Sequence, residues 1–141
     1  MEADLRELLA TIRDPHLHRL LTIVFSEGSP TWAAFREVPA AKYYHHAYRH
    51  GLLEHCLTVA QAVSAISAIF PGIDRDLAVT GALLHDIGKL DSYELDGETD
   101  EVSMSDLGRL YGEIALGFYR VRRVIERLEG FPPELEQALS H

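Results

Sequence analysis

Residues 83–89 have the sequence Leu-Leu-His-Asp-Ile-Gly-Lys, and the apolar stretch before them predicts a helix from Leu77 to Asp86. Neighbouring side chains of a helix point about 100° apart, so His85 and Asp86 can converge on one point only at a helix end. Gly88 is the expected helix stop. A buried carboxylate costs several kcal/mol unless it is paired or binds a metal. The His-Asp pair therefore indicates either a capped polar helix end or a metal site that needs further ligands.

A second histidine is expected beside this pair. Apolar periodicity predicts a helix from Leu52 to Ile69, with His55 on its apolar side near the start. Only the short segment 71–74 separates the two helices, so they should pack antiparallel and bring His55 next to His85. A lone inward-facing histidine is more often a hydrogen-bonded core residue than a ligand. The nearby His-Asp pair shifts that balance toward a shared metal site.

The composition is that of a single globular domain. The chain has 141 residues, 47% hydrophobic and 25% charged, and 13 Lys plus Arg against 22 Asp plus Glu give a formal charge of −9. Such a surface repels polyanions, which disfavours long RNA or DNA as substrates. The single Cys56 is expected to be a small core residue. No secretory leader pattern or long apolar run is present, so a cytoplasmic location is expected.

The remaining segments predict an all-α fold. Asp14 and Pro15 form the expected N-cap and first position of a helix. Residues 91–106 are acidic and are interpreted as a solvated loop rather than a calcium site. No strand pattern is evident, and we expect one domain in which an N-terminal extension, residues 1–40, packs on a core of residues 41–141. Further helices are predicted over residues 4–12, 15–25, 31–35, 111–128 and 134–141.

The segment 42–51 is rich in histidine, tyrosine and cations and has little periodicity. His46 and His50 have the spacing of two zinc ligands on one helix. Because no nearby cysteine or carboxylate completes a four-ligand set, we interpret the segment as a wall that faces the substrate.

Several short motifs together resemble the HD superfamily of metal-dependent phosphohydrolases, most closely the HD domain of YhaM-type 3′→5′ exoribonucleases. The resemblance covers nearly the whole chain. The segments that carry it are Asp14-Pro15, Pro39-Ala40-Ala41-Lys42, His45-His46-Ala47-Tyr48, Gly51-Leu52-Leu53-Glu54-His55, Ile73-Asp74-Arg75-Asp76-Leu77 and Gly81-Ala82-Leu83-Leu84-His85-Asp86-Ile87-Gly88-Lys89.

This resemblance implies an HD-domain helical bundle in which His55, His85 and Asp86 bind a divalent ion. It places Lys89 near the substrate phosphate, so Asp86 and Lys89 are the expected catalytic residues. Substrate-binding residues would be Lys42, His45, His46 and Lys89. Imidazole and carboxylate ligands suit Mn, Fe, Co, Ni, Zn or Mg without selecting one of them.

The sequence departs from the family pattern at three places. Where the family has Gly-His after the acidic segment, this chain has Gly112-Glu113, and where the family continues through Ser-His-His-Gly to a later aspartate, it ends at Ser140-His141. Glu113 and His141 are therefore the candidate ligands of a second ion, and the domain is expected to be truncated at its C-terminus. The N-terminal OB-fold usual in YhaM-type proteins has no counterpart after Met1.

Two functions remain in competition at this point. The first is a metal-dependent phosphohydrolase, a nuclease or nucleotidase, acting on nucleotides or short oligonucleotide ends. The alternative is a catalytically impaired HD-fold binding or regulatory module. The expected partners are a small phosphorylated substrate or a short single-stranded nucleic acid, with no membrane, and a homodimer is left open.

Overall fold

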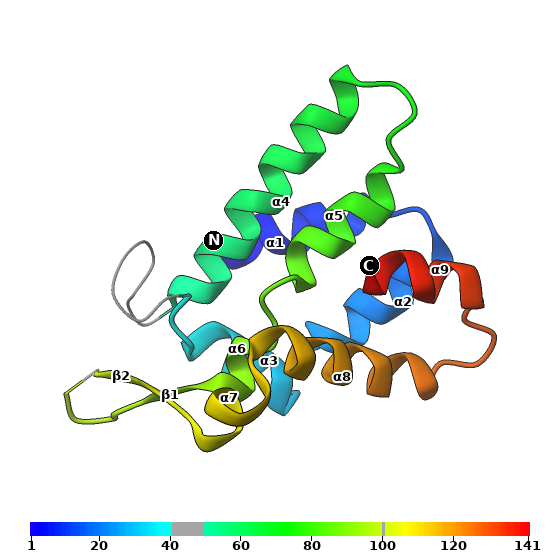
Figure 1. The fold of residues 1–141 in the computed structure, drawn as a ribbon. Coiled ribbons are helices and arrows are strands. Elements are labelled where there is room, and N and C mark those ends of the chain that lie inside the picture. Colours follow the sequence, from blue (N-terminus) through cyan, green and yellow to red (C-terminus); the bar gives the residue numbers. More distant parts are fainter. Residues whose placement is uncertain (41–49, 100) are drawn as a thin grey trace.

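The structure is a computed structural model that describes residues 1–40, 50–99 and 101–141. Helices make up most of it (Figure 1), which confirms the predicted all-α class. A small antiparallel hairpin of β1 (Tyr93–Leu95) and β2 (Val102–Met104) was not predicted. The helices are α1 (Glu2–Ala10), α2 (Pro15–Val24), α3 (Pro30–Glu37), α4 (Gly51–Ile69), α5 (Arg75–Leu84), α6 (Lys89–Ser92), α7 (Asp106–Tyr111), α8 (Glu113–Glu126) and α9 (Pro133–Ser140).

The N-terminal helices begin at side-chain caps. The Asp14 carboxylate accepts hydrogen bonds from the backbone N–H groups of His16 and Leu17, and proline occupies the first turn of α2. Ser29 caps α3 in the same way by accepting from Trp32 N–H at 3.0 Å. Each cap satisfies backbone donors that would otherwise lack a partner, so the predicted helix start at Asp14-Pro15 is confirmed.

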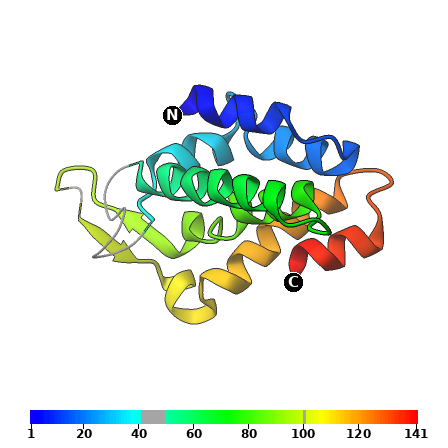
Figure 2. The same ribbon diagram turned by 90° about the horizontal axis from the view of Figure 1, so that it is seen from above.

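Helices α4 and α5 run antiparallel, side by side, as the sequence predicted (Figures 1 and 2). Both contribute to one hydrophobic core, which α1–α3 join through fully buried residues such as Leu5, Leu20 and Phe35. The first half of α4 is packed into this core, whereas Ile69 near its end is 71% exposed. Among the described helices, only α4 has the length and apolar character of a membrane span, which is weak evidence because core helices pass the same test.

Two predicted helices have different bounds in the structure. The helix expected to reach Asp86 ends at Leu84, and the chain turns through residues 85–88 into α6. Gly88 is not a left-handed helix stop, because its φ is −62°. The long helix expected from residue 111 is broken at Gly112, whose φ of 78° lies in the region that favours glycine.

The reason for glycine at position 88 is a close approach of two backbones. A Cβ added at Gly88 would lie 1.8 Å from the carbonyl oxygen of Glu113, and one added at Gly117 would lie 3.1 Å from the Gly88 nitrogen. A similar contact joins α7 to α6, because a Cβ at Gly108 would meet the Ser92 carbonyl oxygen at 2.6 Å. Glycines therefore let α7 and α8 pack directly against the segment that follows His85 and Asp86.

Candidate metal centre

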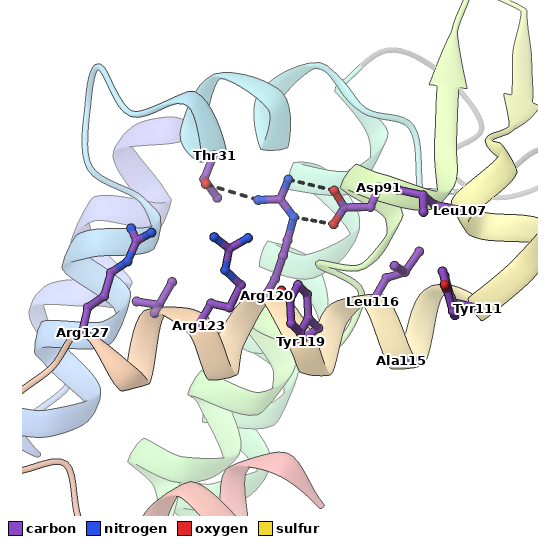
Figure 3. Close-up of a pocket in the computed structure, with 11 residues that line it drawn as sticks. Thr31, Asp91, Leu107, Tyr111, Ala115, Leu116, Tyr119, Arg120, Arg123 and Arg127 are labelled. Atoms are coloured by element: carbon purple, nitrogen blue, oxygen red, sulfur yellow. Dashed lines mark hydrogen bonds and ion pairs between the residues drawn. The ribbon is translucent and has the colours of Figure 1, made fainter.

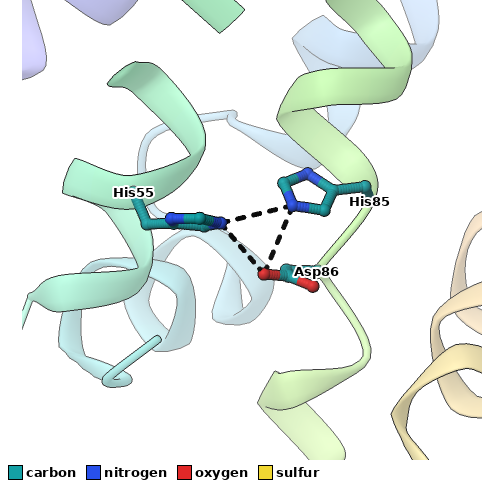
Figure 4. Close-up of side chains that lie close together, drawn as sticks. All are labelled: His55, His85 and Asp86. Carbon is teal, nitrogen blue, oxygen red and sulfur yellow. Dashed lines mark hydrogen bonds and ion pairs between the residues drawn. The ribbon is translucent and has the colours of Figure 1, made fainter. Parts of the chain in front are cut away.

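Three predicted ligands come together at the junction of α4 and α5. His55 lies in the second turn of α4, and His85 is the C-cap residue directly after α5. Asp86 follows in the turn before α6, where the chain is no longer helical. This turn allows the adjacent side chains of His85 and Asp86 to point toward the same place as His55 (Figure 4).

The three donor atoms form a nearly equilateral triangle. Nε2 of His55 is 3.3 Å from Nε2 of His85, and each of these nitrogens is 3.3 Å from Oδ2 of Asp86. Ligands bound about 2.0–2.2 Å from one ion stand about 3–3.5 Å apart in tetrahedral or octahedral geometry. The separations and the two-imidazole, one-carboxylate chemistry of the set both fit a single divalent ion.

The ring of His85 is oriented for binding by a backbone contact. Its Nδ1 lies 2.6 Å from the carbonyl oxygen of Ala82. A carbonyl oxygen only accepts, so Nδ1 carries the proton and, in the neutral ring, Nε2 presents its lone pair to Asp86 and His55. Metal-binding histidines are commonly fixed by such a second hydrogen bond.

Lys89 pairs with the Asp86 carboxylate. Its Nζ donates to Asp86 Oδ2 at 2.9 Å and lies 3.9 Å from Glu113 Oε2, and its side chain is only 12% exposed. Burial acts to raise the pKa of Asp86, but hydrogen bonds from His85 and Lys89 outweigh it and the pKa falls below its usual range. The carboxylate therefore stays ionised, as a metal ligand must.

The pKa values of the two partners of Asp86, His85 and Lys89, are shifted upward. The hydrogen bond to Asp86 raises the pKa of His85 above its ordinary value. Burial acts to lower the pKa of Lys89, but its pairing with Asp86 is stronger and the pKa is raised. A proton on His85 and an ion at the same Nε2 therefore compete for one position.

Cys56 is a core residue, as its position on the helix suggested. It is fully buried, and burial followed by the nearby Asp86 charge raises the pKa of its thiol to about 12. A thiol with this pKa is neutral and unreactive at physiological pH. Among the described residues, the group close enough to share an ion consists of His55, His85 and Asp86, without Cys56.

The two residues predicted to bind a second ion, Glu113 and His141, are not part of the three-residue group. Glu113 contacts Lys89 rather than joining the three-residue group. His141 lines, together with His85, a pocket of about 710 Å³ between α5, α8 and α9. Lys42, His45 and His46 lie outside the described residues, so their predicted role at the substrate stays a prediction.

Sequence reasoning missed the contacts that hold the segment after the metal ligands. Asp91, interpreted as a surface residue, is half-buried and forms a two-point ion pair with the Arg120 guanidinium of α8. No local signal pairs these residues, because 29 positions separate them. Tyr111, which lines the same pocket as His85, lies at the start of the helix predicted over residues 111–128, and that pattern alone does not mark it as a site residue.

Two relatives of this chain carry the same protein name. The chain is 28% identical over 126 residues to the 3′-5′ exoribonuclease YhaM of Shouchella clausii, covering 89% of this chain and 38% of that protein. It is 30% identical over 118 residues to the protein of the same name from Bacillus subtilis, covering 84% of this chain and 36% of the relative. The chain thus spans little more than a third of the length of these curated relatives.

Protein families and solved structures give different results for this chain. No solved structure matches the chain significantly. The HD domain family matches residues 52–139, a span that begins three residues before His55 and includes His85 and Asp86. Since the match covers more than half of the sequence, the chain belongs to the HD domain family.

Proposed function

We propose that the protein hydrolyses phosphoester bonds of nucleotides or of short oligonucleotide ends with a divalent ion held by His55, His85 and Asp86. The observation that carries this proposal is the triangle of three donor atoms with 3.3 Å sides. Membership of the HD domain family and the similarity to proteins named exoribonucleases support the same reaction class.

The side chains around the triangle have separate tasks in this proposal. Three protein ligands leave open positions, at which a bound divalent ion supplies a nucleophilic water and neutralises phosphoryl charge. Ala82 holds the His85 ring in the tautomer that keeps Nε2 free for the ion. Lys89 places a buried positive charge beside Asp86, where it can attract a substrate phosphate.

The pocket beside His85 gives the rest of the substrate a place to bind. Its walls include the aromatic rings of Tyr111 and Phe118 and the C-terminal His141. Aromatic faces suit a nucleobase, which would leave the phosphate at the ion. The net charge of −9 favours small or short substrates over long polyanions.

A binding or regulatory module without turnover is the second candidate, and one contact favours it. The Lys89 ammonium lies 2.9 Å from Asp86 Oδ2, the same oxygen that completes the triangle. An ammonium at this distance competes with a metal ion for that oxygen and would weaken binding.

The two candidates are distinguished by metal content and hydrolysis measured on the same samples. We would supply Mn, Co, Ni or Zn, measure bound metal by elemental analysis, and assay nucleotides and short RNA. His85→Ala removes one ligand, and His18→Ala, which removes an exposed histidine of α2, is the matched control. We expect bound metal and hydrolysis in the wild type and the control, and neither in His85→Ala.

Other results would decide against the proposal in distinct ways. Bound metal that depends on His85, without hydrolysis of any phosphoester, supports the non-catalytic module. No bound metal with any of the ions overturns the metal centre itself. Hydrolysis that survives in His85→Ala places the reaction elsewhere in the protein.

A further inference from the structure

A second pocket, of about 750 Å³, lies on a different face of α8 from the pocket beside His85. Helices α3, α6 and α7 complete its walls (Figure 3). Three arginines extend into it from the same side: Arg120 and Arg123 of α8, and Arg127, the residue at which α8 is capped. The residues that matter for its chemistry are Arg120, Arg123, Arg127, Tyr111, Tyr119 and Leu107.

The three arginines differ in how their charges are compensated. Arg120 is held by Asp91 and also donates to the Thr31 hydroxyl at 3.3 Å. The guanidinium of Arg123 lies 5.4 Å from the ring centroid of Tyr119. Within residues 1–40, 50–99 and 101–141, no carboxylate forms an ion pair with Arg123 or Arg127.

Arg123 and Arg127 repel each other weakly when no anion lies between them. Both side chains are exposed, and Arg127, the C-cap residue of α8, follows Arg123 by four positions, a spacing at which like charges are unfavourable. The neighbouring Arg122 shows the usual solution, because it pairs with Glu126 at 3.3 Å and with Glu136 at 3.6 Å. In a chain with a net charge of −9, two uncompensated cations facing one pocket indicate a site for an anion.

The residues that line this pocket indicate which class of anion fits it. Guanidinium groups match the geometry of phosphate oxygens and bind them through two parallel hydrogen bonds. Tyr111 and Tyr119 are 59% and 58% exposed, and Leu107 is 50% exposed, so flat and apolar surface is available beside the arginines. Aromatic rings next to cations are the arrangement on which unpaired bases stack.

We propose that this pocket binds a nucleoside phosphate, with the phosphate at Arg123 and Arg127 and the base against Tyr119. Tyr111 and Ala115 line both this pocket and the one beside His85, so the two sites adjoin at the start of α8. The ligand is either a free nucleotide or one unit of a short strand whose end reaches the metal centre. Only the second alternative rests on the proposed hydrolysis, because binding at the arginines needs no metal.

Binding in the presence of EDTA tests this site separately from the metal centre. Fluorescently labelled ribonucleoside monophosphate and a short labelled RNA would be titrated with wild type, Arg123→Gln, Arg127→Gln and Arg122→Gln. Each of the two pocket variants loses a charge-assisted contact, so binding should weaken about tenfold or more. Arg122→Gln makes the same charge change outside the pocket and should alter binding by less than about twofold. His18→Ala, at an exposed position outside both pockets, should bind as the wild type does.

The titrations also separate the two sources of the ligand. Equal affinity for the monophosphate and the RNA assigns the pocket to free nucleotides, and tighter binding of the RNA assigns it to a strand.

The proposal is overturned by absence of binding in EDTA or by equal losses in Arg122→Gln and the pocket variants. It is also overturned by competition from inorganic phosphate or a glutamate-rich peptide as strong as that from the nucleotide. Thermal unfolding of each variant checks that these exposed substitutions leave the fold intact.

Discussion

The starts of α2 and α3 and the metal centre are held by contacts of different range. Helices α2 and α3 begin at caps whose donors lie within three residues of Asp14 and Ser29. In the metal centre, by contrast, the Nε2 atoms of His55 and His85 meet across thirty positions of sequence. A local contact confines the effect of a substitution to one helix, whereas a long-range contact transmits it to the site.

The largest effect is expected where two backbones touch. Gly88→Ala would place a Cβ 1.8 Å from the Glu113 carbonyl oxygen, and a backbone atom cannot move aside as a flexible side chain can. We expect the free energy of unfolding to fall by about 3 kcal/mol or more. Urea unfolding measures this loss, and elemental analysis should show that metal binding falls with it because Asp86 is two residues away.

Gly81→Ala is the matched control for this substitution. Gly81 is inside α5, and a Cβ added there meets nothing within 4 Å. Alanine is the better helix residue, so this variant should gain about 0.5–1 kcal/mol of stability. If both variants lost stability equally, the close contact of Gly88 with α8 would not be the cause.

An intermediate effect is expected from pH on metal binding. The hydrogen bond to Asp86 raises the pKa of His85, and the proton and the ion compete for Nε2. Metal affinity should therefore fall as pH decreases through this raised pKa, approaching about tenfold per pH unit below it. Above that pKa the affinity should level off. Titration with a chelating indicator at several pH values measures the curve, and an affinity constant across the range would contradict the assigned role of His85.

The sequence could predict contacts that leave a pattern in residue types, whether they are local or long-range. The start of α2, the antiparallel packing of α4 with α5 and the convergence of His55, His85 and Asp86 followed from residue types at known spacings. The close contact of Gly88 did not, because its partner is the backbone of Glu113 and leaves no pattern in side-chain types.

Other differences between the prediction and the structure arose where the sequence pattern was short or ambiguous. The paired strands 93–95 and 102–104 span three residues each, too few to show alternation against an acidic background. Gly112 was read as part of a helix because a glycine within an apolar period is compatible with either a helix or a break. Its φ of 78° shows the break.

The smallest effect is expected from the cap of α2, and it tests the local side of the comparison. Asp14→Ala removes the acceptor for the His16 and Leu17 N–H groups, which should cost about 1 kcal/mol of stability. The Asp14 backbone N–H still donates to Asp76 at 2.8 Å, so the link between α2 and α5 remains.

Glu7→Ala, at an exposed position of α1, controls for the loss of one negative charge. Metal content should be unchanged in both variants, since a lost cap frays one helix end without moving α4 or α5. Loss of bound metal in Asp14→Ala would show that the N-terminal helices position His55 and His85, and the separation between local and long-range contacts would fail.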